Sequence, residues 1–176
     1  MAFYDPMTKI YHGLEVPDIY HPNASLGQVL LWNFYKRPQK VIQVNDDDGI
    51  SVTCEEMAEL MTNIAKNLNQ LGLVFGDVAG LFGSSTTYVA PTMFACYLYG
   101  LPMTPLDVSF NVNQIVQIYR QTNPKIVFCD HSVAEKLTCA LEILQINAII
   151  VILTERLEGF LHITDLIRAP DKPVRL

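Results

Sequence analysis

From residue 78 onward, short apolar runs alternate with segments of helical periodicity, and this alternation constrains the fold most. The runs lie at residues 78–82, 102–105, 125–129 and 148–153. Runs of this length predict strands, and parallel strands need a helical crossover between them. The last run is apolar throughout, which is typical of a strand covered on both faces. The order predicts an α/β fold with an open, mostly parallel, doubly wound sheet.

The segments between these runs carry signals for helix ends. Residues 87–99 predict a helix in which Pro91 lies in the first turn, where backbone amides have no helical partner. Gly100 is expected to end that helix, and Asn111 to cap the next one.

Two further signals lie near the C-terminus. Ser132 and Glu135 have the spacing of a capping box, which predicts a helix that begins there and runs to about residue 144. Residues 161–164 predict a weak final strand.

The first 72 residues predict a smaller leading unit made of a helix, a hairpin and a helix. Residues 41–44 and 50–53 flank an Asp-Gly turn, the usual signal for a β-hairpin. Thr53 and Glu56 form a capping box for the second helix, and Gly72 supplies its left-handed stop. We therefore expect a leading unit at residues 1–72 and a first α/β layer at residues 73–176.

Charge is sparse in this chain. Charged residues make up 17 % and hydrophobic residues 50 %, and the net charge is −6. Lysine and arginine are scattered without a basic stripe, so no nucleic-acid partner is expected. No charge lies between Asp77 and Asp107, but glycine and proline interrupt the stretch before it reaches the roughly 20 apolar residues of a membrane span. We expect no such span.

The N-terminus lacks a basic segment followed by an apolar core, so the sequence predicts a protein that is not secreted and keeps its thiols reduced. Without C-x-x-C spacing, the cysteines are expected to act as small buried hydrophobes. They are Cys54, Cys96, Cys129 and Cys139.

Ligands of an open parallel sheet bind beyond the carboxyl ends of its strands. These ends are predicted at residues 83–87, 106–107, 130–131 and 154–155. The first suits an anion best, because Gly83, Ser84 and Ser85 follow a strand and lead into a helix. It lacks the spacing of a dinucleotide fingerprint or of a phosphate-binding P-loop. An ordinary turn is therefore preferred, with a phosphate contact as the alternative.

The remaining polar groups do not make a complete catalytic set. Cys129, Asp130 and His131 offer a nucleophile, an acid and a base in a row, but adjacent side chains rarely face one another, so structural roles are preferred. The acidic run at residues 46–48 predicts a solvated turn rather than a cation site. Asp107 is expected to order its loop. The histidines lack metal-ligand spacing; they are His12 and His21 in a loop-like N-terminal segment, and His162. The sequence thus assigns no catalytic, cofactor-binding or metal-ligating residue.

Four stretches, taken together, resemble the N-terminal part of the adenylate-forming enzymes, the family of acyl-CoA synthetases, 4-coumarate–CoA ligases and luciferase-like proteins. They are residues 51–60, 75–79, 95–107 and 123–128, in consistent order. Gly83-Ser84-Ser85 stands where many members have Asn-Ser, and residues 113–115 stand where Glu-Leu is common. The resemblance implies the fold of an incomplete large N-terminal domain.

The resemblance also implies a two-step reaction, in which ATP and Mg²⁺ activate a small-molecule carboxylic acid to an acyl-adenylate and CoA then receives the acyl group. It implies a cytoplasmic or peroxisomal location. Residues 170–176 resemble the approach to the family's phosphate-binding loop. We therefore expect a chain that binds no cofactor by itself and is inactive alone.

Two alternatives stay open at this point. One is a non-catalytic interaction protein derived from the same scaffold, which pairs through exposed sheet faces. The other is a small nucleotide-binding α/β module that uses Gly83, Ser84 and Ser85.

Overall fold

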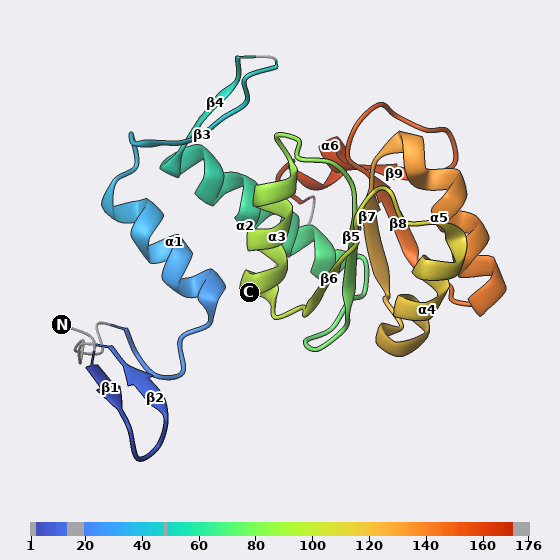
Figure 1. Cartoon of the computed structure of the whole chain (residues 1–176). Coiled ribbons are helices and arrows are strands. Elements are labelled where there is room, and N and C mark those ends of the chain that lie inside the picture. The colour runs from blue at the N-terminus through green and yellow to red at the C-terminus, as the bar shows by residue number, and fades with distance from the viewer. Residues whose placement is uncertain (1–2, 14–19, 48, 171–176) are drawn as a thin grey trace.

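The computed structural model describes residues 3–13, 20–47 and 49–170. Its main sheet has five parallel strands in the order β6-β5-β7-β8-β9 (Figure 1). The strands are β5 (Ala79–Phe82), β6 (Met103–Pro105), β7 (Ile126–Cys129), β8 (Ile149–Ile152) and β9 (Leu161–His162). The open parallel sheet predicted from the alternating runs is confirmed.

Helices cover both faces of this sheet (Figure 1). Successive residues of a strand point to opposite faces. In β7, Ile126 and Phe128 join the hydrophobic cluster of α2 (Cys54–Gln70) and α3 (Val89–Tyr99). Val127 and Cys129 join the cluster of α4 (Val112–Thr122) and α5 (His131–Leu144). The doubly wound prediction is confirmed, and pairing through a bare sheet face has no support in the described structure.

The chain changes faces between β5 and β7. The crossover helix that follows β5 is α3, on one face, whereas α5 follows the neighbouring strand β7 on the other face. Diverging crossovers leave a crevice at the carboxyl ends of two such strands, and that crevice is where doubly wound sheets bind ligands. The fold therefore places its candidate site at the β5–β7 end.

The leading unit has the predicted helix, hairpin and helix. They are α1 (Leu26–Lys36), the antiparallel pair β3 (Val41–Val44) and β4 (Ser51–Thr53), and α2. The Thr53–Glu56 capping box is present, with both reciprocal hydrogen bonds. Buried residues of α2 share one hydrophobic cluster with those of β5 and β7, so a domain boundary at residue 72 stays a prediction.

Helices α1 and α3 touch along their backbones. A Cβ at Gly27 in α1 would overlap the backbone of Leu98 in α3. Glycine therefore permits this close approach, which brings α1 against the body of the domain.

The start of α5 differs from the prediction. The helix begins at His131 with Asp130 as its N-cap, and no side-chain capping hydrogen bond is present. The expected capping box of Ser132 and Glu135 is wrong, because Asp130 follows β7 directly and Ser132 already lies inside the first turn. Asn111 does cap α4, through a box with Gln114, and Pro91 does lie in the first turn of α3.

Two terminal segments also differ. Residues 161–164 form only a two-residue strand, β9, before α6 (Ile163–Leu166) begins with His162 as its cap. The expected strand is too long because residues 163 and 164 are helical. The loop-like N-terminal segment holds a hairpin of β1 (Phe3–Asp5) and β2 (Ile10–His12), so His12 lies in a strand. Residues 171–176, and with them the expected approach to a phosphate loop, lie outside the described residues.

Candidate functional site

The crevice between β5 and β7 is closed by the chain's own carboxylate. The backbone amide of Ser84, in the loop after β5, donates a 2.7 Å hydrogen bond to Oδ2 of Asp130, at the end of β7. Asp130 is only 4 % exposed. A backbone amide beside a glycine at this edge is what an anionic ligand would use, and here Asp130 occupies it.

Gly83 makes this contact sterically possible. A Cβ at Gly83 would lie 2.7 Å from Oδ1 of Asp130, which is closer than real Cβ atoms come. Within the described residues, Oδ1 of Asp130 has no hydrogen-bond partner. The loop and the carboxylate are thus packed against each other, and the ordinary turn preferred from the sequence fits better than a phosphate cradle.

Hydrogen bonds of His162 and Arg156 connect the segment after β8 to β9 and α6. His162 Nε2 lies 2.6 Å from the carbonyl oxygen of Thr154, and the backbone amide of His131 donates to Oγ1 of Thr154. Arg156 donates to both carboxylate oxygens of Asp165, and this contact lowers the pKa of Asp165. These polar groups serve internal bonds along the edge of the sheet.

Asp107 orders its loop as predicted. Its carboxylate accepts a 2.8 Å hydrogen bond from the backbone amide of Ser109, and contacts with Ser109 lower the pKa of the carboxyl. In the acidic turn, Asp46 and Asp47 are exposed and Asp48 lies outside the described residues. Across the described ranges, no three His, Cys, Asp or Glu side chains gather as a metal site.

Two cysteines of the core, Cys96 and Cys129, are poor candidates for a nucleophile. Burial raises the pKa of both Cys96 and Cys129 to about 12, so neither thiol ionises near neutral pH. Cys54 is also buried, as expected. Cys139 is exposed on α5, so the expectation that it is buried is wrong.

The residues present at this edge do not fit ATP or Mg²⁺. The amide most suited to a phosphate is already bonded to Asp130, and the carboxylates that could approach a cation lie in separate loops.

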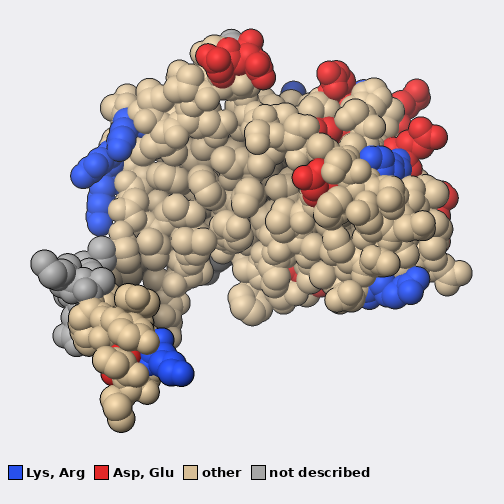
Figure 2. Space-filling view, in the orientation of Figure 1, with Lys and Arg blue, Asp and Glu red and all other residues tan. Residues whose placement is uncertain are grey.

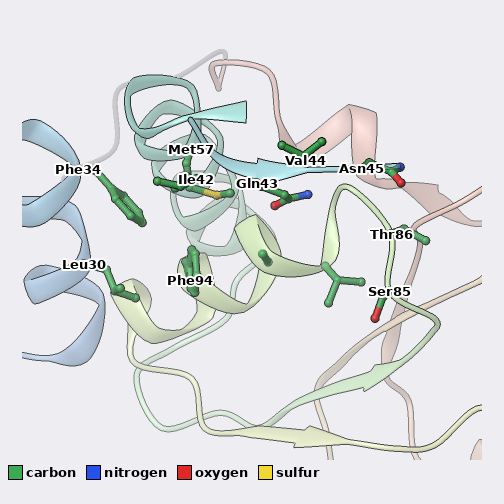
Figure 3. A pocket seen from close by; sticks show the side chains of 12 residues that line it. Leu30, Phe34, Ile42, Gln43, Val44, Asn45, Met57, Ser85, Thr86 and Phe94 are labelled. Atoms are coloured by element: carbon green, nitrogen blue, oxygen red, sulfur yellow. The ribbon is translucent and has the colours of Figure 1, made fainter. Parts of the chain in front are cut away.

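A cavity of about 490 Å³ opens on the other side of the Gly83–Thr87 loop (Figure 3). Gln43 and Asn45 of the hairpin hold it open, since each donates a 3.0 Å hydrogen bond to Thr87, one to its carbonyl oxygen and one to Oγ1. One end of the cavity is apolar and the other polar (Figure 3). Leu30, Phe34, Ile42, Met57 and Phe94 line the apolar end, whereas Gln43, Asn45, Ser85 and Thr86 bring polar atoms to the other end, beside Val44.

The cavity suits binding more than chemistry. Its volume lies within the range of roughly 300–1,000 Å³ that is typical of small-molecule sites. The residues that line it include no charged side chain. Among the described residues, it therefore offers no ionisable acid or base.

Sequence reasoning missed two features. The hydrogen bonds of Gln43 and Asn45 to Thr87 join residues more than 40 positions apart, and no local pattern signals them. Lys36, Arg37 and Lys40 gather at one edge, so the description of lysine and arginine as scattered is wrong there. The segment KRPQK, at residues 36–40, carried that signal.

Known proteins resemble this chain in sequence and in fold. The sequence pattern of the family described as AMP-binding enzyme matches residues 30–171. The equisetin synthetase of Fusarium heterosporum is 26 % identical over 95 residues, which cover 54 % of this chain and 2 % of that protein. The chain thus spans a small part of the curated relatives that it matches.

Two solved structures illustrate the likeness in fold. The luciferase-like enzyme of the mealworm Zophobas morio matches with a TM-score of 0.79 and 19 % identity, over 87 % of this chain and 37 % of that one. A benzoate CoA ligase of Burkholderia xenovorans matches with a TM-score of 0.73 and 17 % identity, over 82 % and 28 %. With its doubly wound sheet and a family match across most of its length, the chain belongs to the AMP-binding enzyme family.

Proposed function

We propose that this chain forms the N-terminal scaffold of an enzyme that activates a carboxylic acid with ATP to an acyl-adenylate and transfers the acyl group to CoA. The observation that carries the proposal is the family match over residues 30–171, which includes the whole doubly wound sheet. The benzoate CoA ligase shares this fold and supports an acid as substrate and CoA as acceptor. Mg²⁺ would accompany ATP, as the resemblance of the sequence implies.

We further propose that residues 1–176 do not catalyse this reaction by themselves. Two features support this. The amide of Ser84 is bonded to Asp130, and the cavity beside it lacks charged side chains. The chain spans 37 % of the luciferase-like enzyme, so residues that hold the nucleotide would come from elsewhere in a longer protein. A cytoplasmic or peroxisomal location belongs to the same proposal. None of the described helices is long and apolar enough to cross a bilayer.

Acid-dependent exchange of pyrophosphate into ATP tests both proposals. The first protein assayed is residues 1–176, with Mg²⁺ and a panel of fatty, aryl and amino acids, and we expect no exchange. The second is the product of the longest transcript that encodes these residues, with which we expect exchange for at least one acid. Exchange by residues 1–176 would overturn the proposed inactivity. A longer product that exchanges with no acid, although folded, would overturn the ligase proposal.

A further inference from the structure

Three cations gather at the C-terminal end of α1. Lys36, Arg37 and Lys40 are exposed and lie at one edge of the molecule, whereas most acidic side chains in view lie over other parts (Figure 2). The chain as a whole has a net charge of −6. A local positive surface on an acidic protein selects the face that approaches a negatively charged partner.

A hollow of about 420 Å³ lies between these cations. Tyr20 and Asn33 line it together with all three basic residues. Asn33 Nδ2 donates a 2.7 Å hydrogen bond to the hydroxyl of Tyr20, and Lys36 Nζ lies 5.8 Å from the centre of the Tyr20 ring. These two contacts hold Asn33 and Lys36 against Tyr20 in the wall of the hollow. A phosphate group in the hollow could contact several cations at once.

The three cations have no acidic partner within the part of the chain that the structure describes. The ion pair found there joins Arg156 to Asp165, far along the chain. Glu55 follows Cys54, which lines the hollow, and Glu55 accepts a hydrogen bond from Gln39. Among the described residues, then, none of these three cations is held in an ion pair.

Exposed aromatic rings flank the cations. Trp32 is 45 % exposed and Tyr35 is 62 % exposed, both on α1. The Trp32 ring stacks on Tyr20, with centroids 6.3 Å apart, so the aromatic rings adjoin the basic hollow. Tryptophan and tyrosine next to lysine and arginine are the side chains that settle at the interface of a bilayer, where rings meet the acyl boundary and cations meet phosphates.

We propose that this surface docks on an anionic lipid bilayer. The surface, here called the α1 edge, consists of Tyr20, Trp32, Tyr35, Lys36, Arg37 and Lys40. The hollow receives a lipid phosphate, and Trp32 and Tyr35 enter the headgroup region. Attachment is peripheral, through one helix and its C-terminal turn. This inference does not depend on the proposed ligase activity.

Trp32 reports directly on the proposal, because it is the one tryptophan in the sequence. The full chain is titrated with vesicles of phosphatidylcholine alone and of phosphatidylcholine with phosphatidylserine. We expect the emission of Trp32 to shift to the blue, and to be quenched by brominated lipid, only with the anionic vesicles. Added salt should reverse the shift, because it screens the attraction to the charged headgroups.

Two charge-matched triple variants make the test specific. Lys36→Ala, Arg37→Ala and Lys40→Ala together should lower the partition coefficient on anionic vesicles roughly a hundredfold, since each cation near a surface contributes separately. Arg120→Ala, Lys125→Ala and Arg168→Ala together remove the same charge from exposed positions elsewhere and should change it far less. Far-UV circular dichroism confirms that both variants are folded.

Three results would overturn the proposal. One is equal binding to the two kinds of vesicle, and another is an equal loss of binding in both triple variants. The third is a response of Trp32 to soluble polyglutamate or to inorganic phosphate that matches or exceeds the response to anionic vesicles, which would identify an acidic protein surface or a free anion as the partner.

Discussion

The backbone amide of Ser84 and the carboxylate of Asp130 meet across the crevice between β5 and β7, with a donor–acceptor distance of 2.7 Å. This crevice lies where the crossover helices change faces, the position at which a doubly wound sheet accepts a ligand. A side chain of the protein therefore fills the place that an anion would take. The Ser84–Asp130 hydrogen bond thus closes this crevice. The open cavity lies beside it and is lined in part by residues of the β3–β4 hairpin.

Asp130→Ala should lower the free energy of unfolding by about 1–3 kcal/mol, because it leaves the amide of Ser84 without its acceptor and opens a space beside Gly83. Urea unfolding followed by circular dichroism measures the change. Asp107→Ala is the matched control, since Asp107 also accepts from a backbone amide but is exposed. The role assigned to Asp130 is wrong if its variant is no less stable than the control.

Thr53→Ala should cost about 1 kcal/mol of unfolding free energy, because it removes the capping hydrogen bond from the first turn of α2. Ser132→Ala should cost almost nothing, because Ser132 does not cap α5. Both hydroxyl side chains have a glutamate three residues later, so the two positions look equivalent in the sequence, and thermal unfolding of the two variants tells whether both act as helix caps. Equal losses would argue for the capping box that the structure lacks.

Gly27→Ala should destabilise the fold strongly, by about 3 kcal/mol or more, because the added Cβ would overlap the backbone of Leu98 where α1 meets α3. Gly13→Ala provides the control, since a Cβ at Gly13 meets nothing within 4 Å. Denaturant midpoints of the two variants give the comparison. A small effect of Gly27→Ala would mean that α1 does not lie against α3 as the structure has it.

One thiol in four should react with a disulfide reagent in the native protein. Cys139 is exposed, whereas Cys54, Cys96 and Cys129 are buried and burial raises the pKa of the last two to about 12. All four should react in denaturant, because the sequence holds four cysteines. Cys139→Ser should abolish the fast native reaction. Rapid reaction of a second native thiol would contradict the packing of the core around β7 and α3.

The fold was predictable where its causes are local. Apolar runs define β5, β7 and β8, and the Thr53–Glu56 and Asn111 caps lie within four residues of their partners. The start of α5 was not predictable in this way. Ser132 has the local pattern of a helix cap, but the helix begins at His131, directly after the end of β7. Tertiary context decides between the two.

The candidate site was predictable only in position. The carboxyl ends of the strands follow from the alternation, and so does the Gly83–Thr87 loop. That Asp130 would reach Ser84, 46 residues away, depends on the adjacency of β5 and β7. The cavity depends on Gln43 and Asn45 reaching Thr87, and the α1 edge on how Tyr20 folds onto Trp32. Such contacts join distant segments, and periodicity carries no information about them.

Isothermal titration of residues 1–176 with ATP and with AMP, in the presence of Mg²⁺, tests whether the described loops hold a nucleotide. We propose that these strands and helices are the scaffold of an AMP-binding enzyme and that its described loops do not themselves bind ATP or AMP. We therefore expect no heat of binding at millimolar nucleotide. Saturable binding of either nucleotide that is retained when Lys36, Arg37 and Lys40 are all replaced by alanine, in a protein that remains folded, would contradict it.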